Sequence, residues 1–454
     1  MATLLVVRVL SPSDYGLFGF ATLVTGIADL VAELGLGAAI VQKRDLDRDG
    51  LDTIFWTSMA TGTVIYALTW LLAPAIAQFF RQDRLTAVLR VAMLAFIVGS
   101  ARVIPWNLLT KQIDFARRSS AEAAAAVLSS GATLLLAWRG WGVWSLVAGL
   151  LCRSIVLTVL CFWFMPWRPR WRYSTTHLGG IIRFGAEVAG GRISWYLYNN
   201  SDLLVVGKLL GEQALGLYSL VFQVVVLPTD RITSIISQVG FPVYARIQHD
   251  TDRFARYFLE SLTVTSLLTF PILTGLFVTA DLGTVLLLPA RWQAVATPLK
   301  LMCLVGLVLS VSTLIAPAVL AKGRADLPFR FNLGCLVVMP LGFVAGAQFG
   351  LIGVYWAWLL LFPFVAGVWF HLTRSLLGVT WPVLLKALAP ATTASTIMLA
   401  TLLLLRRVAI SLPPLWLLFL LVSVGVPTYF AALELLFPGR IGATRDHVRL
   451  RSST

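Results

Sequence analysis

The stretch RFGAEVAGGRISWYLYNNSDLLVVGK, residues 183–208, decides the fold, because it has the length of a membrane span but carries many polar side chains. A charged side chain near the centre of a lipid core costs roughly 3 kcal/mol or more, so such residues normally face a helix bundle or a wet cavity. At about 100° per residue, one helix face carries Arg192, Trp195, Asn199 and Asp202. We therefore predict a transmembrane helix that lines a polar, water-filled path, with Glu187 and Asn200 on the same helix.

Composition places the whole chain in the membrane. Of its 454 residues, 58% are hydrophobic and 13% are charged, and the mean hydropathy is +0.84. A soluble globular protein is far less apolar. Apolar runs recur from end to end, and each has about the 20 residues that a helix needs to cross the hydrocarbon core. The sequence therefore predicts an all-α polytopic membrane protein.

The positive charge and the cysteines do not indicate nucleic acid or metal chemistry. The net charge is +15, but the excess Lys and Arg fall in short loops between apolar runs, so we predict no nucleic-acid partner. The four cysteines lie inside apolar runs without CxxC spacing, which is typical of buried structural thiols. No HExxH motif or His/Cys cluster occurs, so we predict neither a metal site nor catalytic residues.

The spans follow one another almost without long loops. The first ten residues are apolar but cover only about 15 Å as a helix, so we expect them to be the end of a helix whose beginning is missing. We predict that thirteen full spans follow, one of them at about 255–280. We divide the chain into an N-terminal lobe (1–165), a cytoplasmic loop (166–180), a C-terminal lobe (181–374), two trailing helices (375–438) and a cytoplasmic tail (439–454).

The distribution of basic residues predicts the orientation. If the C-terminus is cytoplasmic, 22 Lys/Arg lie in cytoplasmic loops and the tail, ten lie on the opposite side, and four lie within spans. Cytoplasmic loops of membrane proteins carry an excess of Lys and Arg. We therefore expect a multi-pass protein with its C-terminus in the cytoplasm.

The two halves of the chain resemble each other. VVRVLSPSDYGLF (6–18) aligns with VGKLLGEQALGLY (206–218) at an offset of 200 residues. LLTKQIDFAR (108–117) aligns with VLAKGRADLPFR (319–330), and GVWSL (142–146) with GVYWA (353–357), both at an offset near 211. The offset covers an even number of spans, so the repeats are parallel. Transporters built this way bind substrate between the halves and rock one against the other.

The charges inside the predicted spans are mostly cationic. Arg153 and Arg192 lie near the middle of their spans, Arg231 lies deep in its helix, and Arg102 could either face a cavity or extend its side chain to the interface. Guanidinium groups match phosphate oxygens bidentately, so this set suits a diphosphate. Asp29 and Glu33 form a like-charge pair that suits a proton or cation site, although a buried ion pair would explain each charge equally simply.

Two longer stretches carry a family resemblance. RVLSPSDYGLFGFATLVTGIADLVAELGLGAAIVQ (8–42), and SDLLVVGKLLGEQALGLYSLVFQVVVLPTDRI (201–232) followed by FPVYARIQHD (241–250), resemble the two repeat openings of Wzx-type polysaccharide flippases. These belong to the multidrug/oligosaccharidyl-lipid/polysaccharide (MOP) exporter superfamily. The resemblance implies a MOP/MATE-like fold of two six-helix lobes plus two C-terminal helices, here with a truncated first helix. It also implies a V-shaped cavity and both termini in the cytoplasm.

The resemblance implies a flippase that moves undecaprenyl-diphosphate-linked oligosaccharide across the bacterial inner membrane by alternating access. We expect Arg153, Arg192, Arg231 and Arg102 to bind substrate, and the coupling or gating carboxylates to be Asp202, Glu187, Asp29 and Glu33. Asn199, Asn200 and Trp195 would add polar contacts in the cavity. No cofactor is expected beyond a coupling proton or sodium ion. The expected protein is a monomer, with other polysaccharide assembly proteins as further partners.

Two other functions fit the sequence less well. A drug or cation antiporter of the same superfamily would need acidic and aromatic groups to dominate the cavity. A membrane polysaccharide polymerase or ligase would need a large extracytoplasmic loop for its catalytic residues. Neither feature is present, so we expect a transporter and not an enzyme.

Overall fold

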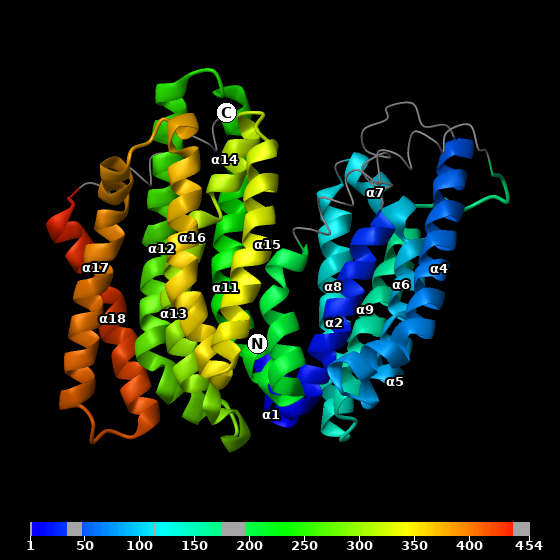
Figure 1. The fold of residues 1–454 in the computed structure, drawn as a ribbon, viewed down its shortest axis with the longest axis horizontal. Helices are drawn as coiled ribbons and strands as arrows, with labels where there is room; N and C mark the ends of the chain where they lie inside the picture. The colour runs from blue at the N-terminus through cyan, green and yellow to red at the C-terminus, as the bar shows by residue number, and fades with distance from the viewer. Residues whose placement is uncertain (1, 34–47, 113, 174–195, 439–454) are drawn as a thin grey trace. The chain divides into compact units, whose positions relative to one another are not determined.

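The computed structural model describes residues 2–33, 48–112, 114–173 and 196–438, and these are helical apart from short connections (Figure 1). Eleven helices within these ranges are long and apolar enough to cross a membrane. The predicted all-α membrane fold is confirmed. The chain forms two compact units, Met1–Ser219 and Leu220–Thr454. The lobe boundaries predicted from the sequence stay a prediction.

Unit 1 holds the helices of the first half of the chain and the beginning of α11. The helix α1 (Ala2–Val9) packs on α8, and α2 packs against α4, α5 and α9. The pair α8 and α9 forms the most extensive helix contact in the unit. The remaining bounds are α2 (Pro12–Glu33), α4 (Arg48–Phe80), α5 (Arg84–Ala92), α6 (Leu94–Ala101), α7 (Val103–Lys111), α8 (Phe115–Trp138) and α9 (Val143–Phe164).

Unit 2 is arranged around α12 (Thr251–Leu287), which contacts α13, α16, α17 and α18. The trailing pair α17 and α18 packs against α12 through an apolar cluster that includes Val278, Met398 and Leu421. The Tyr429 hydroxyl of α18 donates to the Leu267 oxygen of α12 at 2.9 Å. The other bounds are η2 (Ala290–Val295), α13 (Ala296–Ser312), α14 (Ile315–Ala321), α15 (Asp326–Ala347), α16 (Gly350–Leu377), α17 (Trp381–Val408) and α18 (Pro414–Leu436).

The helix α11 (Ser201–Arg246) is two helices joined at Gly211, whose φ of 84° favours glycine. In a straight helix Asp202 and Tyr218 would lie about 24 Å apart. Instead, the Tyr218 hydroxyl donates to the Asp202 carboxylate. The chain therefore reverses at Gly211, and residues 201–210 and 212–246 form a hairpin without a loop.

The helix breaks recur at the offsets of the sequence repeat. Between α1 and α2 the chain turns at Ser11, which is 200 residues before the turn at Gly211. The break between α6 and α7 at Arg102 corresponds to the break between α13 and α14 at Thr313, at an offset of 211. Proline explains the second pair, because Pro105 and Pro317 each stand at the third residue of the following helix and cannot bond to the carbonyl four residues earlier. The breaks therefore agree with the predicted internal repeat.

An ion cluster joins three helices of unit 2. One oxygen of Asp281 on α12 accepts both from Lys300 Nζ of α13 at 2.6 Å and from Arg406 Nη2 of α17 at 2.8 Å. A second nitrogen of Arg406 donates to the Val278 oxygen at 3.1 Å. The three charged side chains are about one-third exposed, so water still screens their attraction.

We expect Asp281→Asn to lower the stability of the protein by about 1 kcal/mol, because it leaves two partly buried cations without their shared carboxylate. The measurement is thermal unfolding in detergent. The matched control is Glu434→Gln, which removes the same charge from an exposed position on α18. Equal melting temperatures for the two variants would show that the cluster does not hold the helices together.

Candidate functional site

The two repeat openings contact each other reciprocally within unit 1. A Cβ placed on Gly16 of α2 would lie 1.8 Å from the backbone oxygen of Glu212. A Cβ placed on Gly216 would lie 1.8 Å from the backbone oxygen of Pro12. These residues are related by the 200-residue offset, so each repeat presents a glycine to the helix start of the other. We call this contact the repeat junction. Only glycine allows two backbones to approach so closely.

Polar side chains tie the repeat junction together. The Ser13 hydroxyl donates to one carboxylate oxygen of Glu212, and the other Glu212 oxygen is buried without a partner in the described parts of the chain. Ser11 caps α2: its hydroxyl accepts from the Asp14 N–H at 3.1 Å and donates to the Asp14 carboxylate at 2.6 Å. Asp14 also accepts from the Val143 N–H at 3.2 Å, so one carboxylate serves the N-termini of both α2 and α9.

The described residues before Gly211 pack along α2. The Tyr196 hydroxyl donates to the Leu23 oxygen at 3.1 Å, and a Cβ on Gly26 would lie 2.1 Å from that hydroxyl. Further along, a Cβ on Gly207 would lie 2.3 Å from the Phe20 ring. The described end of the stretch 183–208 is thus bound closely to the first repeat.

Asp202 lies inside the hairpin of α11. It is 1% exposed, and Tyr218, which donates to it, is fully buried. The other Asp202 oxygen accepts from the Leu203 N–H at 2.8 Å. The carboxylate thus holds the two arms of the hairpin together, and its predicted coupling role stays a prediction.

Arg153 is exposed half-way along α9. The exposed apolar side chains of this helix are Trp144, Ile155, Val159 and Trp163. At about 100° per residue, Arg153 lies about 120° or more around the helix from the first three and about 80° from Trp163. Its side chain therefore leaves α9 on the side opposite Trp144 and Ile155, and its role in binding substrate stays a prediction.

The other two described cations have different surroundings. Arg102 is half-buried at the break between α6 and α7, with its guanidinium beside Gly99. Arg231 is exposed on α11, on the same face as the exposed Ile235 one turn later. Arg231 belongs to unit 2, whereas Arg102 and Arg153 belong to unit 1.

Several predicted site residues lie outside the described structure. This holds for Arg192, Glu187 and Trp195, and for the side chains of Asp29 and Glu33, whose backbone belongs to α2. Asn199 is exposed, and the Asn200 side-chain amide donates to the Tyr196 backbone oxygen, four residues earlier, at 2.9 Å. The substrate-binding and coupling roles of all these residues stay predictions.

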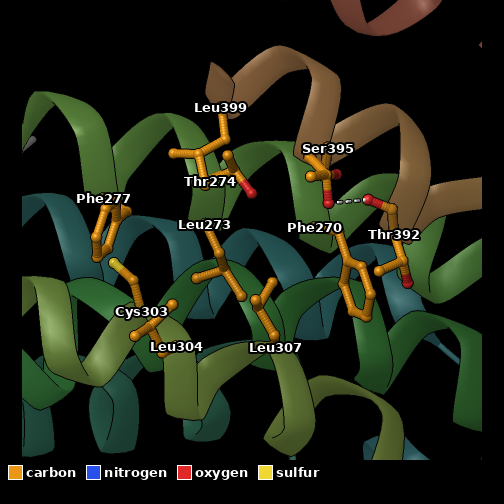
Figure 2. Close-up of a pocket in the computed structure, with 11 residues that line it drawn as sticks. Phe270, Leu273, Thr274, Phe277, Cys303, Leu304, Leu307, Thr392, Ser395 and Leu399 are labelled. Atoms are coloured by element: carbon orange, nitrogen blue, oxygen red, sulfur yellow. Dashed lines mark hydrogen bonds between the residues drawn. The ribbon is translucent and has the colours of Figure 1, made fainter. Parts of the chain in front are cut away.

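Unit 2 contains an apolar pocket of about 140 Å³ between α12, α13 and α17 (Figure 2). Ser395 is 6% exposed, and its hydroxyl has no hydrogen-bond partner among the residues that the structure describes. Ser395 and Cys303 stand near the middle of their helices, so the pocket lies at mid-helix depth. It can hold a segment of hydrocarbon chain but offers no charge to an ionic group. Its lining is Phe270, Leu273, Thr274, Phe277, Cys303, Leu304, Leu307, Thr392, Ser395, Thr396 and Leu399.

The residues of the repeat junction were not among the site residues predicted from the sequence. The glycines Gly16 and Gly216 align in the repeat, so the alignment itself held a signal for them. Ser13 and Glu212 are 199 residues apart, and nothing local in the sequence indicates that they meet. Tyr218 looks like any other aromatic residue of an apolar helix, so its contact with Asp202 needed the structure.

Comparison with known proteins decides the family. Residues 5–297, well over half of the chain, match the polysaccharide biosynthesis protein family. The chain belongs to this family. The match covers both repeat openings and so includes the residues on which the resemblance to polysaccharide flippases rests. The predicted family membership is confirmed.

Curated proteins that are similar to this chain support the assignment. The lipopolysaccharide biosynthesis protein WzxC of Escherichia coli is 28% identical over 78% of this chain and 72% of its own length. The teichuronic acid biosynthesis protein TuaB of Bacillus subtilis is 28% identical over 76% of this chain and 72% of its own length. The succinoglycan biosynthesis transport protein ExoT of Rhizobium meliloti is 23% identical over 72% of this chain and 66% of its own length.

Solved structures share the fold of this family member. The lipid II flippase MurJ in an inward closed conformation superposes with a TM-score of 0.78 at 14% identity, over 97% of both chains. An inward-facing multidrug MATE transporter of the MOP superfamily gives 0.69 at 17% identity, over 83% of this chain and 93% of that chain. The predicted MOP/MATE-like fold is confirmed.

Proposed function

We propose that this protein is a flippase that moves an oligosaccharide linked to an isoprenoid diphosphate lipid across the bacterial inner membrane. Family membership and relatives named for lipopolysaccharide and exopolysaccharide synthesis support this proposal. The observation that carries it is Arg153, an exposed cation half-way along the apolar helix α9, on the side opposite Trp144 and Ile155. A guanidinium in such a place suits a phosphate-bearing cargo.

Two further features fit a lipid-linked cargo. The repeat junction brings the two repeat openings into backbone contact just after the turns at Ser11 and Gly211, and internal repeats of this kind are typical of alternating-access transporters. The pocket of α12, α13 and α17 has the apolar lining that an isoprenoid segment needs. Coupling to protons or sodium, a cytoplasmic C-terminus, a monomeric state and contacts with other assembly proteins stay predictions.

The test is complementation of surface polysaccharide synthesis in cells that lack the chain. We expect Arg153→Gln to lower polymer output about tenfold, because one charge-assisted contact to phosphate is worth roughly 1.5–3 kcal/mol. Arg153→Lys keeps the charge and should retain part of the activity. The matched control is Arg139→Gln, which removes an exposed arginine at the end of α8.

Full activity of Arg153→Gln at normal protein levels would refute the role of Arg153. Failure of the wild-type chain to restore any polymer would refute the flippase itself. Export of an organic cation driven by a proton or sodium gradient would instead favour the antiporter function.

A further inference from the structure

Arginines and aromatic residues alternate in a non-helical segment directly after α9. We call residues 168–173 (RPRWRY) the arginine–tryptophan segment. Arg168, Arg170 and Arg172 are all exposed. Trp171 is 89% exposed and Tyr173 is 57% exposed. So much exposed aromatic surface beside cations is unusual for a loop in water and typical of a membrane interface.

The backbone of this segment is fixed by the first turns of α4. The Arg170 N–H donates to Oδ1 of Asp52 at 3.1 Å, and Asp52 is fully buried. The Trp56 indole N–H donates to the Arg170 oxygen at 2.8 Å. Both polar backbone groups of Arg170 are therefore used by α4, while its side chain is exposed.

The side chains on either side of Arg170 are held as well. The Trp171 ring stacks on Trp56 with 4.2 Å between centroids and 25° between planes, so one ring face is covered and the other is open. Arg172 pairs with Asp49 at 3.6 Å. Arg168 donates to the oxygens of Phe162 and Trp167 at 3.1 and 2.9 Å. The surface is therefore formed in advance, before any ligand binds.

The segment continues the lipid-facing surface of α9. Trp163, in the last turn of that helix, is 79% exposed, and the arginines begin five residues later. Two further exposed cations lie near the same end of unit 1: Arg48 is the first residue of α4, and Arg117 stands in the first turn of α8. Apolar surface, aromatic rings and guanidinium groups thus follow one another in the order of a bilayer leaflet: hydrocarbon, interface and phosphate.

We propose that the arginine–tryptophan segment is a preformed docking surface for the phosphate headgroups of anionic phospholipids in the adjoining leaflet. Arg170 and Arg172 bind the phosphates, and Trp171 lies at the boundary with the acyl chains. Asp52 is a positioning residue, because it holds the Arg170 backbone and touches no lipid. The surface makes the protein selective for anionic over zwitterionic lipid, independently of the cargo that it transports.

The experiment is a lipid titration of the full, delipidated chain by native mass spectrometry, with phosphatidylglycerol and phosphatidylcholine as probes. Each arginine near an anionic membrane surface contributes about a fivefold change in affinity. We expect Arg170→Gln/Arg172→Gln to weaken phosphatidylglycerol binding by more than about tenfold and to leave phosphatidylcholine unchanged. The matched control is Arg84→Gln/Arg139→Gln, two exposed arginines at other helix ends of unit 1, which should behave as wild type.

A second variant separates a preformed surface from diffuse charge. Asp52→Ala keeps every arginine and removes one negative charge, so simple electrostatics would strengthen phosphatidylglycerol binding. A preformed surface would lose its shape, and we expect binding to weaken. Stronger or unchanged binding of Asp52→Ala, at an unchanged melting temperature, would overturn the proposal.

Other outcomes would overturn it too. An equal loss of phosphatidylglycerol affinity in the control variant Arg84→Gln/Arg139→Gln would show that binding depends only on the total charge of the protein. No preference of the wild-type chain for phosphatidylglycerol would point instead to an acidic protein partner. Full competition by soluble glycerol phosphate would show a site for free phosphate and not for a lipid surface.

Discussion

We expect Gly16→Ala to abolish polymer export and to reduce the yield of folded protein, because the new methyl group has no space at the repeat junction. The Cβ would lie 1.8 Å from the oxygen and 2.7 Å from the carbon of the Glu212 peptide. A flexible side chain could turn away from such a contact, but a backbone carbonyl at a helix start cannot. Forced overpacking costs typically 1–3 kcal/mol or more. The measurements are detergent-extracted yield, melting temperature and complementation.

The control for Gly16→Ala is Gly131→Ala. Gly131 is also a helical glycine of unit 1, but an added Cβ would meet no atom within 4 Å. We expect it to be neutral or slightly stabilising, because alanine favours helix. Equal behaviour of the two variants would show that the helices at the junction separate freely.

The reciprocity of the junction adds a second test. In Gly216→Ala the added methyl group meets the Pro12 backbone in the same way, so this variant should lose about as much stability as Gly16→Ala. The double variant should lose less stability than the two single variants together, because helices that one methyl group has already moved apart have room for the other. Additive losses would mean that the two contacts are independent and that the repeats do not meet as one unit.

The hydropathy of the sequence predicted where helices lie, but not where they end. The predicted span 255–280 is part of α12 (Thr251–Leu287). The helix begins earlier because the Asp250 carboxylate accepts from the Arg253 N–H at 3.0 Å, which caps a polar first turn. The length of an apolar run corresponds to the thickness of the hydrocarbon core, whereas capping side chains determine where the helix begins and ends. The break at Thr313 interrupts an apolar run without any charged residue, and only Pro317 marked it, whereas the break at Arg102 was marked by the arginine itself and by Pro105.

The candidate site was predictable only in part, for a similar reason. A charge in the middle of an apolar run is visible in sequence, so Arg153 was singled out, and the structure shows it exposed half-way along α9, while its substrate-binding role stays a prediction. Which groups approach one another depends on the fold. Asp202 was expected to be a cavity carboxylate, but the structure shows that it also closes the hairpin of α11 through Tyr218, a contact that no local pattern indicates.

We expect Tyr218→Phe to destabilise the protein by about 1–3 kcal/mol, because it removes a donor from a buried carboxylate. The two arms of the α11 hairpin would lose the hydroxyl that joins them. The measurement is the midpoint of thermal unfolding in detergent. The matched control is Tyr66→Phe, which removes a hydroxyl from a partly buried ring on α4. A midpoint no lower than that of the control would contradict the assignment.

Asp202→Asn separates the structural role of this carboxylate from its predicted coupling role. Asparagine keeps an acceptor for the Tyr218 hydroxyl, so the hairpin should stay closed and the loss of stability should be smaller than for Tyr218→Phe. Asparagine cannot bind or release a proton, however, so a coupling carboxylate would lose its function on this change. A stable but inactive Asp202→Asn variant would therefore support coupling at Asp202. A stable and fully active one would limit Asp202 to closing the hairpin, because transport would then proceed without a titratable group at this position.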